Sequence, residues 1–193
     1  MTELYAIVGN MERARVMLEA GVPWLQLRFK ETPLEPHLPE VREWPARYPG
    51  THLIVNDDLD LAVRAGAWGV HLGQEDLARY SPQALRAAPL SVGISTHSDA
   101  EIEIARAHGA AAIGFGPIFP TGTKQVGHPP QGVEELARVV RAVEMPVIAI
   151  GGISDKNLMD VRGTGVAMAA MISHLDHYPT PADLRGLMQA LAG

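Results

Sequence analysis

The sequence predicts an α/β protein with a single domain, residues 1–193, folded as a closed (β/α)8 barrel of the TIM-barrel type. Short apolar runs alternate eight times with amphipathic stretches, at the spacing of βα units. Helix-capping residue types flank the amphipathic stretches. Parallel strands need crossover helices, and eight uninterrupted units favour closure into a barrel. A doubly wound open sheet is the alternative if two strand assignments are wrong.

Each expected strand is a short, mostly apolar run bounded by polar residues, glycine or proline. The eight runs are Leu4–Val8, Trp24–Leu27, His52–Val55, Gly69–Leu72, Ser91–Ile94, Ala111–Phe115, Val147–Ile150 and Val166–Ala170.

The helices between these strands are expected at 11–20, 36–47, 58–66, 81–87, 98–108, 131–143, 155–162 and 180–192. Capping side chains or proline mark the entrances at Asn10, Ser81-Pro82, Ser98, Ser154 and Thr180-Pro181. Glycines that suit a left-handed helix end follow at Gly21, Gly66, Gly109 and Gly163.

Composition limits the class of partner. A hydrophobic content of 47% and a net charge of −6 indicate a globular protein without the basic surface that nucleic acid requires. No apolar run is long enough for a membrane span and no secretion signal is visible, so we expect a cytoplasmic protein. The absence of cysteine excludes disulfides and thiolate chemistry. We expect small-molecule ligands, and a homo-oligomer is an open alternative to a monomer.

Polar residues gather just past the expected strands, where barrel enzymes carry their active sites. These are Gln26, Arg28 and Lys30 after the second strand, Asn56 and Asp57 after the third, Gln74 and Asp76 after the fourth, Ser95 and Thr96 after the fifth, 116–124 after the sixth, and Gly151 and Gly152 after the seventh.

Carboxylates at two neighbouring strand ends predict a Mg²⁺ site. Mg²⁺ binds one or two carboxylates and completes its shell with water and substrate phosphate, and Asp57 and Asp76 suit that demand. Asp58 is better explained as the cap of the following helix, and Glu75 as an outward-facing residue.

Cations and glycines near these carboxylates indicate a phosphorylated substrate. The chain has three lysines, and Lys30 and Lys124 both lie in strand-end segments. An ammonium group can turn its donors onto phosphate oxygens, and a guanidinium such as that of Arg28 can hold two oxygens at once. Backbone N–H groups at Gly151-Gly152 suit a phosphate, because loops after the seventh and eighth barrel strands often form such a cup.

Histidines are assigned structural roles. His71 is expected to face inward as a hydrogen-bonding residue, and His174 to His177 to form a solvated loop rather than a metal site. No Gly-x-Ser-x-Gly nucleophile motif is present.

The chain resembles the thiamine-phosphate synthases (thiamine-phosphate pyrophosphorylases) through nearly its whole length. The motifs that carry the resemblance are 4–8 (LYAIV), 25–30 (LQLRFK), 54–57 (IVND), 69–76 (GVHLGQED), 93–97 (GISTH), 114–124 (GFGPIFPTGTK) and 149–153 (AIGGI). The resemblance implies a TIM-barrel transferase that joins 4-amino-2-methyl-5-hydroxymethylpyrimidine diphosphate to 4-methyl-5-hydroxyethylthiazole phosphate and releases pyrophosphate.

The resemblance also implies roles for individual residues. Arg28, Lys30 and Asn56 would hold the diphosphate with Gln26 beside them, and Asp57 and Asp76 would bind Mg²⁺. Ser95 and Lys124 would contact the diphosphate or the reacting pyrimidine. The thiazole phosphate would be held by Thr121, Thr123, Gly152, Ala169 and Ala170. Of these, Arg28, Lys30, Ser95 and Lys124 are the expected catalytic residues.

Two positions depart from the family pattern: Phe29 stands where an acidic or polar residue is usual, and Ala170 where serine is common. A sister family, the thiazole tautomerases, shares the fold but needs no metal and uses a histidine near the position of Pro117. The proline there and the intact carboxylates favour the synthase over the tautomerase. The carboxylates also argue against a third alternative, a non-catalytic protein that binds thiamine phosphates.

Overall fold

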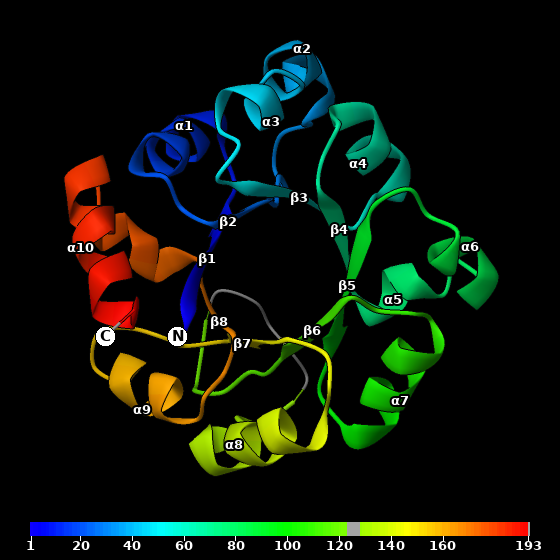
Figure 1. The fold of residues 1–193 in the computed structure, drawn as a ribbon, viewed down its shortest axis with the longest axis vertical. Helices are drawn as coiled ribbons and strands as arrows, with labels where there is room; N and C mark the ends of the chain where they lie inside the picture. Colours follow the sequence, from blue (N-terminus) through cyan, green and yellow to red (C-terminus); the bar gives the residue numbers. More distant parts are fainter. Residues whose placement is uncertain (123–127, 193) are drawn as a thin grey trace.

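The protein is described by a computed structural model, which covers residues 1–122 and 128–192. Eight parallel strands, neighbours in chain order from β1 to β8, close into a barrel, and the helices surround it (Figure 1), as the sequence predicts. The strands are β1 Glu3–Val8, β2 Trp24–Leu27, β3 His52–Asn56, β4 Gly69–Leu72, β5 Ser91–Thr96, β6 Ala112–Phe115, β7 Val147–Ile150 and β8 Met168–Met171.

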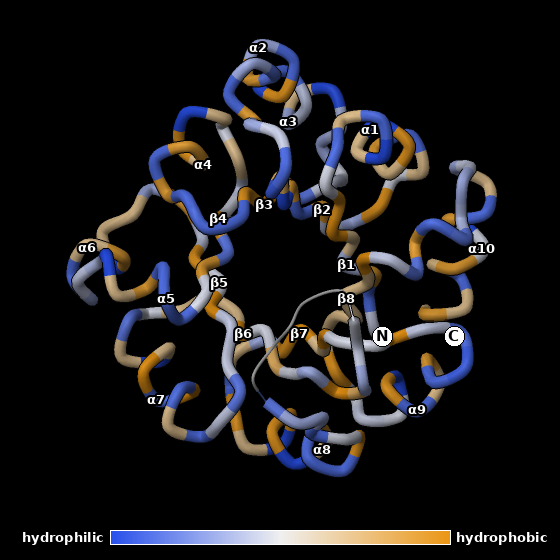
Figure 2. The backbone as a smooth tube through the Cα atoms, turned by 180° about the vertical axis from the view of Figure 1, so that it is seen from behind, coloured by the Kyte–Doolittle hydropathy of each residue, from blue (hydrophilic) through white to orange (hydrophobic). Residues whose placement is uncertain are grey.

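Alternation along the strands separates two apolar layers. Tyr5 and Ile7 of β1 belong to a small cluster inside the barrel, while Leu4 and Ala6 pack in the larger layer between sheet and helices. This period of two follows from the pleat, which sends successive side chains to opposite faces. Figure 2 shows apolar segments along the strands and hydrophilic ones on the outward sides of the helices.

The helices that the sequence predicts are present, with one divided into pieces. The α-helices are α1 Met11–Ala20, α2 Leu38–Val41, α3 Trp44–Arg47, α4 Leu59–Ala65, α5 Gln74–Leu77, α6 Pro82–Arg86, α7 Asp99–Ala107, α8 Gly132–Ala142, α9 Leu158–Gly163 and α10 Pro181–Ala192, with 3₁₀ turns η1 Glu35–His37 and η2 Ser173–His177. Among the described residues, no helix has the length and apolar character needed to cross a membrane.

The expected helix 36–47 is wrong as a continuous element, because it consists of η1, α2 and α3. Each piece has a proline in its first turn: Pro36, Pro39 and Pro45. Proline lacks the N–H that a helix interior needs and fits the first turn, so three prolines divide the segment into three short starts.

Capping confirms most predicted helix ends. Asn10, Asp58, Ser81 and Ser98 each accept a hydrogen bond from a backbone N–H of the first turn. The start at Ser154 is wrong: α9 begins later, at Leu158, and the Oδ1 of Asn157 accepts the Ser154 N–H at 2.8 Å. At the other end, Gly165 rather than Gly163 takes the left-handed conformation, with a φ of 77°.

The segments that follow β4 and β8 contain short helical elements that the sequence analysis does not predict. α5 follows β4 directly, and η2 replaces the expected solvated loop at residues 174–177. Leu175 is buried and anchors η2 to the core, so only part of that segment faces solvent.

Candidate active site

A cavity opens at the carboxyl ends of the strands, where barrel enzymes bind their ligands. It holds roughly 1000 Å³ of space, part of it open to solvent, and Tyr5, Ile7, Ile148 and Ile150 line its apolar side. Seven of the residues predicted from the sequence line it as well: Gln26, Arg28, Asn56, Ser95, Thr121, Gly152 and Ala170. The sequence pattern did not indicate the apolar side, because these residues look like ordinary strand core.

The side chain of His71, a residue of β4, extends over glycines of β5 and β6 on the interior wall of the barrel. Its Nε2 lies 3.0 Å from Ser95 Oγ, a contact that orients the hydroxyl. A Cβ at Gly93 would approach His71 Nδ1 to 2.7 Å, and one at Gly114 would lie 3.1 Å from its Cε1. The two glycines therefore make room for the imidazole, which has the inward, hydrogen-bonding position that the sequence predicts.

Amide side chains complete this wall. Gln26 Nε2 donates to Asn56 Oδ1 at 3.2 Å, which joins the ends of β2 and β3. Gln74 Nε2 donates to the Ser95 carbonyl at 2.6 Å, which joins α5 to β5. These bonds fix the groups that face the cavity.

The two predicted metal ligands come together at the ends of β3 and β4. The carboxyl groups of Asp57 and Asp76 are close enough to share a hydrogen bond. Lys30 forms an ion pair with Asp57, and Arg79 Nη2 donates to Asp76 Oδ1 at 2.8 Å and to the Asp57 carbonyl at 2.7 Å. Arg79 was not predicted, although its position three residues after Asp76 on a helical turn suits such an ion pair.

The paired carboxyls have opposite pKa shifts. Burial raises the pKa of Asp57, but hydrogen bonds from Lys30 and Asp76 and the charge of Arg28 outweigh it, so the pKa lies below its usual value. The pKa of Asp76 is raised, most strongly by partial burial and then by the hydrogen bond and the charge of Asp57. Two acidic groups in contact favour one shared proton, and a divalent cation can take that proton's place. The donor set therefore fits Mg²⁺.

The backbone at Asp57 is strained to place its carboxylate. Asp57 has a φ of 66°, in the left-handed region, and it is the one residue other than glycine with a positive φ in the described part of the chain. Its N–H donates to the His71 carbonyl at 2.8 Å, which holds the turn against β4. Aspartate and asparagine tolerate this conformation better than most residues, and such strain gathers at functional sites.

The predicted cations differ in position. Arg28 lines the cavity, and its N–H donates to the Val8 carbonyl at 2.8 Å. Lys30 is not in the cavity wall: its side chain is 52% exposed and turns toward Asp57. The intervening Phe29 is partly buried against the core and lies edge-on to His37, with ring centroids 6.3 Å apart. Phe29 is thus absent from the cavity lining.

The opposite side of the cavity is formed by loops after β6, β7 and β8. Ile118 and Phe119 donate their N–H groups to the Ile150 and Gly151 carbonyls at 2.9 and 3.0 Å. Gly152, with a φ of 65°, passes so close that a Cβ there would lie 2.5 Å from the Pro120 carbonyl oxygen. This packing brings Thr121 and Gly152 to one cavity wall.

Of the remaining predicted residues, Ala169 is not brought to this wall. Ala169 packs in the layer between sheet and helices and pairs with β1 and β7, whereas Ala170 faces the cavity. Thr123 and Lys124 lie outside the described residues.

Comparison with known proteins identifies the relatives of this barrel. Residues 4–175 match the family model described as thiamine monophosphate synthase. The chain belongs to this family. It is 41% identical to the thiamine-phosphate synthase of Citrobacter koseri, over 98% of this chain and 92% of the relative. It is 41% identical to the thiamine-phosphate synthase of Cronobacter sakazakii, over 97% of this chain and 90% of the relative.

Comparison with solved structures leads to the same family. The thiamine phosphate pyrophosphorylase of Pyrococcus furiosus matches with a TM-score of 0.81 at 31% identity and covers 99% of this chain and 97% of its own. A 3-hexulose-6-phosphate synthase from Salmonella typhimurium, with a TM-score of 0.72 at 17% identity over 99% of both chains, shows the fold alone.

Family membership confirms the transferase activity that the sequence resemblance implies, thiamine-phosphate synthesis. The relatives reported above carry the synthase name, not that of the tautomerases.

Proposed function

We propose that the protein uses Mg²⁺ to join the pyrimidine diphosphate to the thiazole phosphate, with the diphosphate held at the β2–β4 side of the cavity and the thiazole phosphate at the β6–β8 side. The observation that carries the proposal is the contact between the Asp57 and Asp76 carboxyls beside Lys30 and Arg28. An oxygen-rich pair next to two cations is suited to a metal-bound diphosphate.

Arg28, Lys30 and Asn56 act on the leaving group. The bond between the pyrimidine methylene carbon and the diphosphate oxygen breaks, and its electron pair leaves with the diphosphate. Arg28 already lines the cavity, so it can stabilise the charge as it develops with little reorganisation. The exposed Lys30 can leave Asp57 for a phosphate oxygen, since a solvent-exposed ion pair costs little to break.

Asp57 and Asp76 hold Mg²⁺ in this proposal. When bound, the metal supplies positive charge to the diphosphate oxygens. Arg79 keeps both aspartates in place through its two hydrogen bonds, one to the Asp76 carboxylate and one to the Asp57 carbonyl.

The second substrate is positioned for attack. Thr121, Gly152 and Ala170 bound the wall proposed for its phosphate. Thr123 and the Ala169 backbone are further proposed contributors to that wall, and Lys124 is proposed to contact the diphosphate or the reacting pyrimidine. Gln26 and Ser95 orient the pyrimidine, and the lone pair of the thiazole nitrogen forms the new carbon–nitrogen bond at the methylene. Correct placement of the two reactants contributes to the acceleration, and the reaction needs no nucleophilic side chain.

Pyrophosphate release from purified protein tests the proposal. We expect release only when both substrates and Mg²⁺ are present, and loss of release when a chelator removes the metal. Release without added metal in chelator-treated protein would contradict the Mg²⁺ assignment. Metal-independent isomerisation of a thiazole carboxylate phosphate, without pyrophosphate release, would instead indicate the tautomerase reaction.

The proposed synthesis of thiamine phosphate uses phosphorylated metabolites, which supports a cytoplasmic location.

A further inference from the structure

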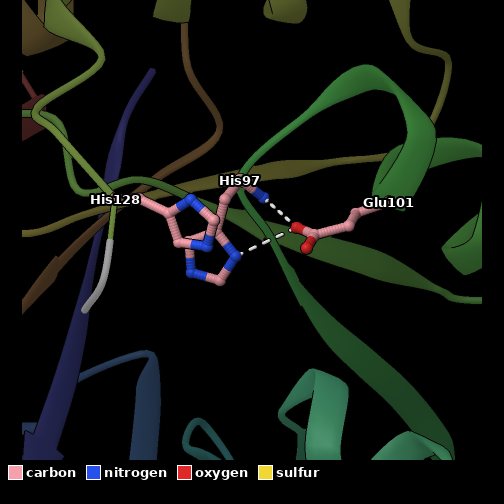
Figure 3. A group of neighbouring side chains, drawn as sticks. All are labelled: His97, Glu101 and His128. Carbon is pink, nitrogen blue, oxygen red and sulfur yellow. Dashed lines mark hydrogen bonds and ion pairs between the residues drawn. The ribbon is translucent and has the colours of Figure 1, made fainter.

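A second group of potential metal ligands lies outside the aspartate pair. His97 follows β5, Glu101 is in the first turns of α7, and His128 precedes α8. One ligand atom from each lies within 4.8 Å of the others, and no other group of three His, Cys, Asp or Glu residues meets this condition in residues 1–122 and 128–192. Figure 3 shows the three side chains turned toward one another.

His97 and Glu101 already have nearly the separation of two metal ligands. Glu101 Oε2 accepts the His97 backbone N–H at 2.6 Å and lies 3.0 Å from His97 Nδ1. Ligands of a tetrahedral ion with bonds of about 2.0–2.1 Å are roughly 3.3 Å apart. On the other side, Gln131 Nε2 donates to the His97 carbonyl at 3.0 Å and holds the residue in place.

His128 completes the group from a different connection. Its ring is stacked on that of His97, with centroids 4.5 Å apart and an angle of 14° between the planes (Figure 3). Parallel rings do not direct their lone pairs to one point, so the His128 ring must turn out of the stack to bind a shared ion. The exposed position of His128 leaves room for that rotation.

Two imidazoles and one carboxylate favour a different ion from the Asp57–Asp76 pair. Mg²⁺ prefers oxygen ligands, whereas imidazole nitrogen favours Zn²⁺ and neighbouring transition metals. Three protein ligands leave one tetrahedral position for water or another ligand. We propose that His97, Glu101 and His128 form a second cation site, at the cavity mouth, for a divalent transition metal such as Zn²⁺.

The site would join two separate parts of the rim. His97 lines the cavity beside β5, and His128 belongs to the connection between β6 and α8. A bound ion would link them and stabilise the folded state, because it binds that state and not the dispersed ligands of the unfolded chain. Zn²⁺ should therefore raise the melting temperature as well as bind with defined stoichiometry.

Calorimetric titration of chelator-treated, tag-free protein with ZnCl₂ tests the proposal, in excess Mg²⁺ so that the aspartate pair is occupied. We expect one Zn²⁺ per chain. His128→Ala should weaken binding by more than roughly 100-fold, beyond the 10- to 100-fold that loss of an outer-shell partner costs. Glu101→Gln, which keeps a hydrogen-bond acceptor for His97, should weaken binding as well.

His177→Ala is the matched control. His177 also belongs to a pair of neighbouring histidine rings, with His174 at 5.0 Å, but it is outside the three-residue group. This variant should bind Zn²⁺ and gain thermal stability as the wild type does. Circular dichroism checks that each variant is folded, which we expect for the exposed His128. Absence of saturable binding, unchanged affinity in His128→Ala, or an equal loss in His177→Ala would overturn the proposal.

Discussion

Replacing Asp57 by asparagine separates catalysis from folding. The substitution removes one of the two carboxylates proposed to hold Mg²⁺ but keeps the size of the side chain. Asparagine also tolerates the left-handed backbone at this position, where φ is 66°. The ion pair that is lost involves a Lys30 side chain that is 52% exposed, so we expect a change in unfolding free energy of less than about 1 kcal/mol.

The Asp57→Asn substitution should lower turnover far more than it lowers stability. Removing one group that stabilises developing charge typically lowers turnover by about 100- to 1000-fold, and about 100-fold corresponds to about 2.7 kcal/mol of activation free energy. Pyrophosphate release at saturating Mg²⁺ and both substrates measures the loss, and urea unfolding measures stability.

Asp58→Asn is the matched control for this experiment. Asp58 Oδ1 accepts the Leu61 N–H at 2.9 Å as the cap of α4, and asparagine caps a helix equally well. This variant loses the same charge one residue away and should keep nearly full activity. Wild-type turnover by Asp57→Asn, or an equal loss in Asp58→Asn, would refute the assignment of Asp57.

Three further outcomes are expected. Asp76 has a raised pKa, and Mg²⁺ requires its deprotonated form. Mg²⁺ affinity measured by calorimetry should therefore decline as the pH is lowered, and the decline should begin above pH 3.8, the ordinary pKa of an aspartate. An unchanged pH profile in Asp76→Asn would contradict this. Arg28→Ala should lower kcat as well as raise KM for the pyrimidine substrate, since the charge it stabilises grows in the transition state; a change in KM alone would indicate simple binding. Gly152→Ala should destabilise the protein by about 2 kcal/mol in urea, because of its positive φ and the nearby Pro120 oxygen. Gly50→Ala, with an ordinary φ and no atom within 4 Å of its Cβ, is the control, and equal stability of the two variants would refute the argument.

The barrel could be predicted because its evidence is local. Each apolar run, cap and terminal glycine can be recognised within a few residues, and the repeated βα order restricts how the strands pair. Position within that order was enough to place Asp57 and Asp76 at neighbouring strand ends. The amphipathic pattern of 36–47 predicts one helix, whereas its three prolines decide the helix starts and divide it into three pieces.

Contacts between segments that are distant in the chain could not be predicted from such local patterns. Arg79 reaches the Asp57 carbonyl across 22 residues of chain, and no short motif records that bond. The His97–Glu101 spacing is visible in one helical turn, but His128 joins them only because β5 and β6 are neighbours in the barrel.

By itself, the sequence determined the order of the elements, the family and the chemical types of the site residues, because these depend on residue identity and short spacings. The tertiary structure decided which of those residues share a cavity, that Phe29 turns away from it, and that the Asp57 and Asp76 carboxyls are in contact. It also produced their opposite pKa shifts, since burial and the distance between charges exist only once the chain has closed into a barrel.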